Sequence, residues 1–80
     1  MTLTQAVKRR INEILAQKNV SLYSLSKSGH ISPNTLKSIM AEHCKGANLK
    51  TVMQIIRAFE MKASEFFNSP LFDSFELDID

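Results

Sequence analysis

The sequence predicts an all-α domain of five short helices followed by a short tail. Apolar residues recur three, four and seven positions apart in several separate segments, which is the spacing of one face of a helix. Residues that favour turns and helix ends separate these segments. The chain has 80 residues, 44% of them apolar, which suffices for one core and one domain. We therefore expect a helical domain over residues 1–68 and a tail over residues 69–80.

The first helix is expected over residues 4–18, where apolar residues form one stripe: Val7, Ile11, Ile14 and Leu15. Thr4 is the expected N-cap residue, and Asn19 is expected to end the helix in a left-handed conformation. Lys8 and Arg9 fall off the apolar stripe, so we expect them on a solvated helix face.

A helix-turn-helix is expected over residues 22–40, LYSLSKSGHISPNTLKSIM. Gly29 tolerates the positive φ angle that a sharp turn between helices demands, and His30 is expected beside it in the turn. Ser32 offers a side-chain oxygen for an N-cap, and Pro33 suits the first position of the next helix. The pattern therefore predicts two short helices set at a steep angle.

Each of these two helices has an inner and an outer side. Ser21 is expected to cap the first of them, and Ser26 is small where the helices must approach closely. The residues expected to point inward are Leu22, Leu25, Leu36, Ile39 and Met40, and those expected to point outward from the first helix are Tyr23 and Lys27. The outer side of the second helix is expected to carry an amide, a cation and hydroxyls, on Ser32, Asn34, Lys37 and Ser38. These groups can pair with base edges or phosphates. A merely solvated surface is the alternative interpretation.

Two further helices follow in the pattern. The stronger one runs from Leu49 to about Glu60 behind an Asn48 N-cap, and its apolar stripe comprises Leu49, Val52, Met53, Ile56 and Phe59. The weaker one covers residues 63–67, with Lys62 in an N-cap position that lysine suits poorly. Asn68, Ser69 and Pro70 are expected to end it.

The tail has a different periodicity. Phe75, Leu77 and Ile79 alternate with Glu76, Asp78 and Asp80, which is typical of a strand with one buried face. Because a lone strand is unstable, the tail must pair with a second subunit, cover an apolar groove or stay disordered. We hypothesise self-association through the last helix and the tail, on Phe66, Phe67, Leu71, Phe72, Phe75, Leu77 and Ile79.

Charge is divided unevenly along the chain. All ten Lys and Arg residues lie within residues 1–62 beside three Glu, a net charge of +7, whereas the last 18 residues carry five acidic residues and no basic ones, a net charge of −5. A basic body with an acidic tail fits a polyanion-binding domain, and an ordinary solvated surface is the alternative. The chain has a single cysteine and no secretory signal, which predicts a reducing, cytoplasmic location. Because no apolar run approaches 20 residues, we expect no membrane segment.

The sequence gives only weak signals for a metal site or an enzyme active site. Glu42, His43 and Cys44 are consecutive, and His30 could join them, but paired Cys or His spacing is missing. We expect a loop there and no metal or other cofactor. The sequence shows no nucleophile with a base at usable spacing, no phosphate-binding glycine loop and no carboxylate pair in the folded part. We therefore predict that the protein is not an enzyme.

The order and spacing of these elements resemble the phage Cro and repressor type of helix-turn-helix domain, the Xre family, over residues 4–67. The resemblance lies in SLYSLSKSGHISPNTLKSI, NLKTVMQIIRAF and ASEFF, and in the small residue at Ser26. It implies a five-helix, lambda-repressor-like fold. One departure is that the turn glycine of the family falls on His30, with Gly29 one position earlier.

The resemblance also implies which residues contact DNA. Base contacts fall on Ser32, Pro33, Asn34, Lys37 and Ser38, although Pro33 can at most touch a thymine methyl group. Phosphate contacts fall on Ser21, Tyr23, Lys27, Lys45 and Asn48.

The expected function is that of a sequence-specific, double-stranded DNA-binding transcriptional regulator, a bacterial or phage-encoded repressor acting as a homodimer on a pseudo-palindromic operator. The alternative is a protein-interaction module, such as an antitoxin or anti-repressor, that binds a protein partner through the last helix and the tail.

Overall fold

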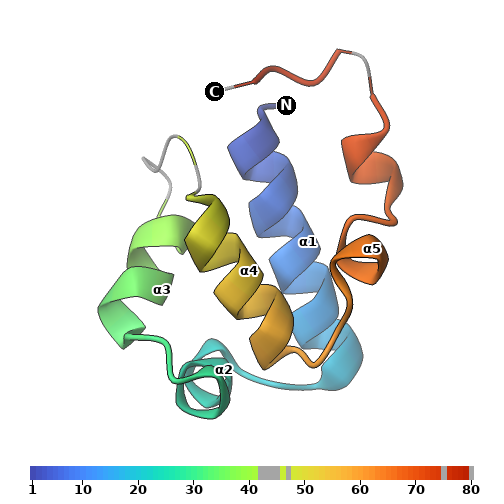
Figure 1. Ribbon diagram of the computed structural model, residues 1–80. Coiled ribbons are helices and arrows are strands. Elements are labelled where there is room, and N and C mark those ends of the chain that lie inside the picture. Colours follow the sequence, from blue (N-terminus) through green and yellow to red (C-terminus); the bar gives the residue numbers. More distant parts are fainter. Residues whose placement is uncertain (42–45, 47, 75, 80) are drawn as a thin grey trace.

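The computed structural model describes residues 1–41, 46, 48–74 and 76–79. Over these residues the chain forms five α-helices and one 3₁₀ turn: α1 (Leu3–Lys18), α2 (Leu22–Gly29), α3 (Pro33–Met40), α4 (Leu49–Ala58), α5 (Ala63–Phe66) and η1 (Pro70–Phe72). In Figure 1, α1 and α4 occupy the centre, α3 and α5 lie on opposite sides of them, and α2 lies at one end. The predicted all-α fold is confirmed.

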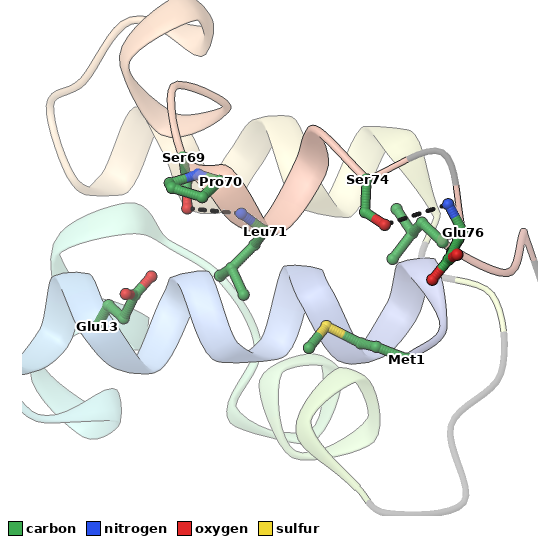
Figure 2. A pocket seen from close by; sticks show the side chains of 8 residues that line it. Met1, Glu13, Ser69, Pro70, Leu71, Ser74 and Glu76 are labelled. Carbon is green, nitrogen blue, oxygen red and sulfur yellow. Dashed lines mark hydrogen bonds between the residues drawn. The ribbon is translucent and has the colours of Figure 1, made fainter.

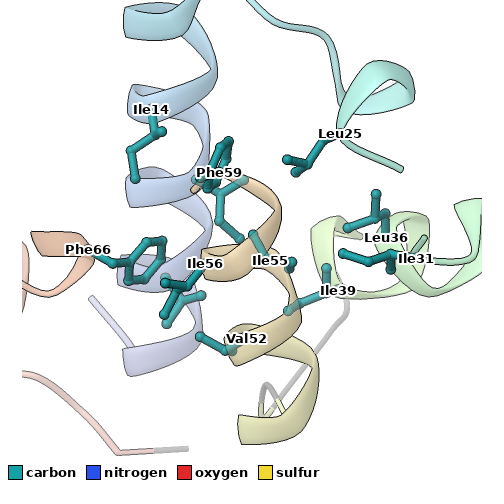
Figure 3. Packing of buried hydrophobic residues seen from close by; sticks show 12 residues of the cluster. Ile14, Leu25, Ile31, Leu36, Ile39, Val52, Ile55, Ile56, Phe59 and Phe66 are labelled. Carbon is teal, nitrogen blue, oxygen red and sulfur yellow. The ribbon is translucent and has the colours of Figure 1, made fainter. Parts of the chain in front are cut away.

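All five α-helices contribute to one core, which Figure 3 shows between α1, α4 and the helix-turn-helix. Its fully buried side chains include Ile11 and Ile14 of α1, Leu25, Leu36, Ile55 and Ile56, and Phe66 of α5. The apolar stripe expected on α4 was wrong at two positions, because Leu49 is 69% exposed and Met53 is 37% exposed. Ile55 takes their place in the core with no exposed surface.

The first helix begins earlier than the sequence indicated. Thr2, not Thr4, is its N-cap residue: the Thr2 hydroxyl accepts a hydrogen bond from the Gln5 backbone N–H at 3.1 Å. The Gln5 side-chain oxygen accepts in return from the Thr2 backbone N–H at 2.9 Å, which completes a capping box. The prediction for Thr4 was wrong because a second threonine two positions upstream offers the same chemistry.

Three helices end in the same way, with a non-glycine residue in the left-handed region. These residues are Asn19 after α1, His30 after α2 and Glu60 after α4, with φ angles of 54°, 53° and 59°. In each case the next backbone N–H donates to a carbonyl five residues back, as in Val20 to Leu15 at 3.0 Å, which is the Schellman motif. The prediction for Asn19 is confirmed. The left-handed Glu60 also explains why α4 ends at Ala58, two residues before the expected end.

A cation on α1 holds α5. The Arg10 Nε donates to the Phe66 carbonyl at 2.6 Å, and its Nη2 donates to the Glu65 carbonyl at 2.9 Å. A four-residue helix is too short to be stable by itself, so these bonds and the burial of Phe66 fix it. Lys62 makes no side-chain capping bond, as expected.

The tail does not form the predicted strand in the part that the structure describes. Ser69 caps the 3₁₀ turn η1 instead, with its hydroxyl accepting from the Leu71 N–H at 3.3 Å and with Pro70 fixing the first φ angle. An isolated parallel bridge then joins Asp78 to Thr2, through Leu3 N–H to the Asp78 carbonyl at 2.7 Å and Asp78 N–H to the Met1 carbonyl at 3.1 Å. The tail thus returns to α1 of its own chain, at the end of the molecule opposite α2 (Figure 1).

Candidate nucleic-acid interface

The turn between α2 and α3 differs from the prediction. Gly29 is the last residue of α2, and His30 carries the positive φ angle. The prediction that Gly29 supplies this angle was therefore wrong, and the expectation that His30 is a turn residue is confirmed. Glycine is needed there for another reason: a Cβ on Gly29 would lie 2.5 Å from the Cβ of Ala58, far inside van der Waals contact. Gly29 lets α2 lie directly against α4.

The buried Ser26 stabilises the turn through hydrogen bonds with Ile31. The Ser26 hydroxyl donates to the Ile31 carbonyl at 2.6 Å, and the Ile31 N–H donates back to the Ser26 carbonyl at 3.0 Å. Ser26 is 6% exposed and Ile31 is 5% exposed, so both bonds are shielded from water. The prediction of a small, inward-facing residue at Ser26 is confirmed, and its hydroxyl also fixes where α3 starts.

Helix α3 begins at Pro33 as predicted, but Ser32 does not cap it with its side chain. Ser32 has φ −57° and ψ 132°, and its contribution to α3 is its backbone carbonyl, which accepts from the Leu36 N–H at 3.2 Å. The capping prediction for Ser32 was wrong. Pro33 suits the first position of the helix, because its missing N–H would have no partner within the helix.

The two sides of α3 separate cleanly by burial. Leu36 and Ile39 are 1% and 5% exposed and lie in the core (Figure 3). The residues predicted to contact bases are all exposed: Ser32, Pro33, Asn34, Lys37 and Ser38. The structure therefore brings an amide, a cation and hydroxyls together on the free side of one eight-residue helix.

The residues predicted to contact phosphates lie mostly on α2. Ser21 caps α2, with its hydroxyl accepting from the Ser24 N–H at 3.1 Å. Tyr23 is 64% exposed, and the Lys27 Nζ lies 4.9 Å from the centre of its ring, a cation–π distance. Asn48 is exposed and caps α4, accepting from the Lys50 N–H at 2.8 Å. Lys45 lies outside the described residues.

Two residues of α1 bond to residues that follow α3, and sequence reasoning missed both bonds. The Lys8 Nζ donates to the carbonyl of Ala41, the C-cap residue of α3, and Lys8 is only partly exposed. Thr4 is 2% exposed, and its Oγ1 accepts from the Gly46 N–H at 2.9 Å. The expectation of a solvated Lys8 was wrong, because its partner lies 33 residues away in the sequence and no local pattern marks it.

The described part of the chain contains neither a metal cluster nor a membrane-spanning helix. No group of three or more His, Cys, Asp or Glu side chains able to hold a metal occurs among the described residues. His30 is exposed in the turn, and Glu42, His43 and Cys44 lie outside the described residues. None of the described helices is long and apolar enough to cross a membrane.

Comparison with protein families gives an independent result for the chain. The family model of the Cro/C1-type HTH DNA-binding domain matches residues 10–70, which is more than half of the chain and includes α2, α3 and α4. Comparisons with curated proteins and with solved structures gave no match. The chain belongs to the family of Cro/C1-type HTH DNA-binding domains and is a DNA-binding transcription regulator.

Proposed function

We propose that the protein is a sequence-specific transcriptional repressor, bacterial or phage-encoded, that binds a pseudo-palindromic operator as a dimer. One observation carries the proposal: every residue on the outer side of α3 that is suited to contact DNA is exposed, while Leu36 and Ile39 hold the other side in the core. A helix of this kind fits the major groove, and coverage of a promoter gives repression.

Base recognition is assigned to three side chains. The Asn34 amide can pair with both edge atoms of adenine, and the Lys37 ammonium can donate to the guanine acceptors. The Ser38 hydroxyl lies one residue beyond Lys37 and accepts or donates. Pro33 lacks a hydrogen-bonding side chain, so its contact is limited to a thymine methyl group.

Backbone anchoring is assigned to the start of α2 and to the start of α4. The N-terminus of the eight-residue α2 carries unpaired N–H groups and a positive dipole end, which suit a phosphate oxygen. Ser21 and Tyr23 lie there, and Lys27 adds a cation one turn later. Lys45 and Asn48 extend the assignment to the segment after α3.

Dimerisation is assigned to the tail side of the molecule. Ile79 is 77% exposed and Phe67 is 37% exposed, and Leu71, Phe72 and Leu77 are partly exposed. A pocket of about 460 Å³ lies between the tail and α1, and Figure 2 shows Met1 and Leu71 among the side chains that line it. Met1 and Leu77 are apolar lining residues that add to this surface. Phe66 has no exposed surface, so it supports the neighbouring residues from the core, and Phe75 lies outside the described residues. Dimers of this type place their recognition helices about 34–36 Å apart.

The proposal is tested by selecting binding sites from random double-stranded DNA with the purified protein. We expect a two-fold symmetric consensus. Lys37→Ala should then relax the preference at one base position in each half-site, whereas Lys45→Ala should weaken binding to all sequences alike. Lys62→Ala is the matched control, because Lys62 is the N-cap residue of α5. Helix α5 lies on the side of the molecule away from α3 (Figure 1). Equal losses on every sequence for Lys37→Ala and Lys45→Ala would refute the assignment of roles.

The dimer is tested by sedimentation equilibrium. Ile79→Asp should shift the mass from dimer to monomer without disturbing the core. Truncation after Asn68 should also shift the mass to monomer, although it removes Phe72, which packs against the core. Leu49→Asp is the control, because Leu49 is 69% exposed at the start of α4. An unchanged mass for both tail variants would refute this dimer surface.

The rival function is a protein-interaction module, which the exposed Ile79 on the acidic tail favours. Salt dependence separates the two functions. Each phosphate neutralised on B-DNA contributes about −0.9 to the slope of log affinity against log salt concentration. An affinity for DNA that does not change with salt concentration would refute the repressor function and leave the protein-interaction module.

A further inference from the structure

We propose that Ser26 of α2 is a positioning residue for base recognition. Its buried hydroxyl fixes the direction in which α3 leaves the turn, so it sets the base specificity of binding without contacting DNA. The inference rests on the proposed function, because it concerns the base contacts assigned to α3. It goes further by placing a determinant of that specificity on the neighbouring helix.

The start of α3 lacks a side-chain cap of its own. Thr2, Ser21 and Asn48 start α1, α2 and α4 with a side-chain oxygen that accepts a backbone N–H. Ser32 makes no such bond at the start of α3. The direction of α3 at its first turn therefore depends on what holds the residues before it.

Ser26 supplies this constraint from α2. Its hydroxyl donates to the Ile31 carbonyl at 2.6 Å, and within the described part of the chain no backbone N–H also donates to that carbonyl. Because a peptide group is planar, the bond that holds the Ile31 carbonyl also sets the direction of the Ser32 N–H. The peptide group that leads into α3 is thus held by a side chain of α2.

Burial makes this bond difficult to replace. Ser26 is 6% exposed and Ile31 is 5% exposed, so water has little access to the carbonyl once the hydroxyl is removed. The carbonyl must then turn toward another donor or toward solvent, and the peptide group ahead of α3 turns with it. The bond from the Ile31 N–H to the Ser26 carbonyl, at 3.0 Å, uses only backbone atoms, so the end of α2 is kept.

The proposed base contacts lie directly beyond the held peptide group. Asn34 and Lys37 follow it on the exposed side of α3. Hydrogen bonds to base edges need donor–acceptor distances of about 2.7–3.2 Å and good alignment, so a small rotation of α3 weakens them. The proposed phosphate contacts of Tyr23 and Lys27 precede the turn. Loss of the Ser26 hydroxyl should therefore reduce base discrimination more than attachment to the DNA backbone.

The test measures two affinities of the full chain, one for the operator found by selection and one for DNA of unrelated sequence. In Ser26→Ala we expect the ratio of the two to fall about five- to tenfold, roughly the discrimination that one base contact carries. The affinity for unrelated DNA, which depends on phosphate contacts, should change by less than about twofold. Ser26→Cys keeps a weak donor of similar size and should give an intermediate ratio.

Ser28→Ala is the matched control. Ser28 is a second serine of α2 whose hydroxyl donates to a carbonyl, that of Leu25 at 3.3 Å, but this bond stays within α2. Its removal should leave the affinity ratio unchanged. All affinities are measured well below the melting temperature of each variant, so that unfolding does not contribute.

Two further measurements separate positioning from a general loss of stability. In an Asn34→Ala background, Ser26→Ala should lower the affinity ratio less than it does in the wild type, because one of the contacts that Ser26 positions is already absent. The NMR chemical shift of the Ser32 amide supplies a readout without DNA. It should change more in Ser26→Ala than in Ser28→Ala.

The wild-type affinity ratio in Ser26→Ala, or an equal loss of affinity for both DNAs, would overturn the specificity role. An equal fall of the ratio in Ser28→Ala would overturn it as well. If Ser26→Ala does not fold, a wild-type ratio in Ser26→Cys would overturn the role and a reduced ratio would support it. A wild-type chain that binds every DNA sequence alike would instead refute the proposed function, and the specificity role with it.

Discussion

Gly29 of α2 faces Ala58 of α4 so closely that a Cβ on Gly29 would lie 2.5 Å from the Ala58 Cβ. The same added atom would lie 3.2 Å from the Ile31 Cδ1, on the side of the turn. At this point α2 therefore contacts α4 through its backbone rather than through a side chain. This close approach sets the depth at which the whole helix-turn-helix lies on the domain.

Gly29→Ala is expected to lower the free energy of unfolding by about 1–3 kcal/mol, the usual cost of overpacking. The direction of this change is informative, because replacing a helical glycine by alanine otherwise stabilises a helix by up to about 1 kcal/mol. Urea denaturation measures the change. Ala58→Gly in the same chain should restore part of the stability, since it removes the clashing atom. A more stable Gly29→Ala variant would show that α2 and α4 do not meet here.

Glycine at the left-handed helix ends is expected to stabilise the protein. His30→Gly and Glu60→Gly each relieve a left-handed conformation that costs non-glycine residues roughly 1–2 kcal/mol, less the greater freedom of glycine in the unfolded chain. We expect a net gain of about 0.5–1 kcal/mol for each in thermal denaturation. Asn19→Gly is the control with little change, because asparagine tolerates this conformation best. A loss of stability in all three variants would contradict the Schellman ends.

Ser21 and Ser32 precede successive helices but should respond differently to alanine. Ser21→Ala removes the bond from the Ser24 N–H and should cost about 1 kcal/mol of stability. Ser32→Ala removes no capping bond and should change stability by less than about 0.5 kcal/mol. Binding to the selected operator completes the comparison, because a base contact by Ser32 would weaken binding without a change in the melting temperature. Equal destabilisation by both changes would show that Ser32 caps α3 in solution.

Arg10→Lys tests the attachment of α5 to α1. Lysine cannot reach the Phe66 and Glu65 carbonyls with two donors in a fixed fork, so we expect a loss of about 1.5–3 kcal/mol, the range for bonds from a charged donor. Hydrogen exchange of the α5 amides should accelerate more than that of α4. Arg9→Lys serves as the control, because Arg9 is exposed. Unchanged exchange in α5 would indicate that the burial of Phe66 alone holds this helix.

Local chemistry explains what the sequence predicted correctly. Asn19, Ser21 and Asn48 end or start helices through bonds to residues within five positions, so the pattern that predicts them lies in one short window. The exposed side of α3 was predictable for the same reason, because helical spacing alone separates Lys37 from Leu36.

The errors occur where distant segments meet. Glycine favours turns, so the sequence placed Gly29 in the turn, while its close approach to Ala58 depends on the packing of two helices. Lys8 and Arg10 bind carbonyls 33 and 56 residues away, and nothing near them in the sequence distinguishes them from solvated cations. The alternating tail predicts a strand, although a strand needs a partner strand that the sequence cannot supply.

The bridge between Thr2 and Asp78 has a consequence for how the tail tolerates change. Its two hydrogen bonds use only backbone atoms, from Leu3 to Asp78 and from Asp78 to Met1. A mutational scan that exchanges one side chain at a time would therefore find residue 78 almost indifferent, with proline as the exception because it lacks the N–H. Variation of the residue type at position 78 would therefore say little about the importance of the bridge. An insertion or deletion that shifts the tail by one residue would reveal that importance.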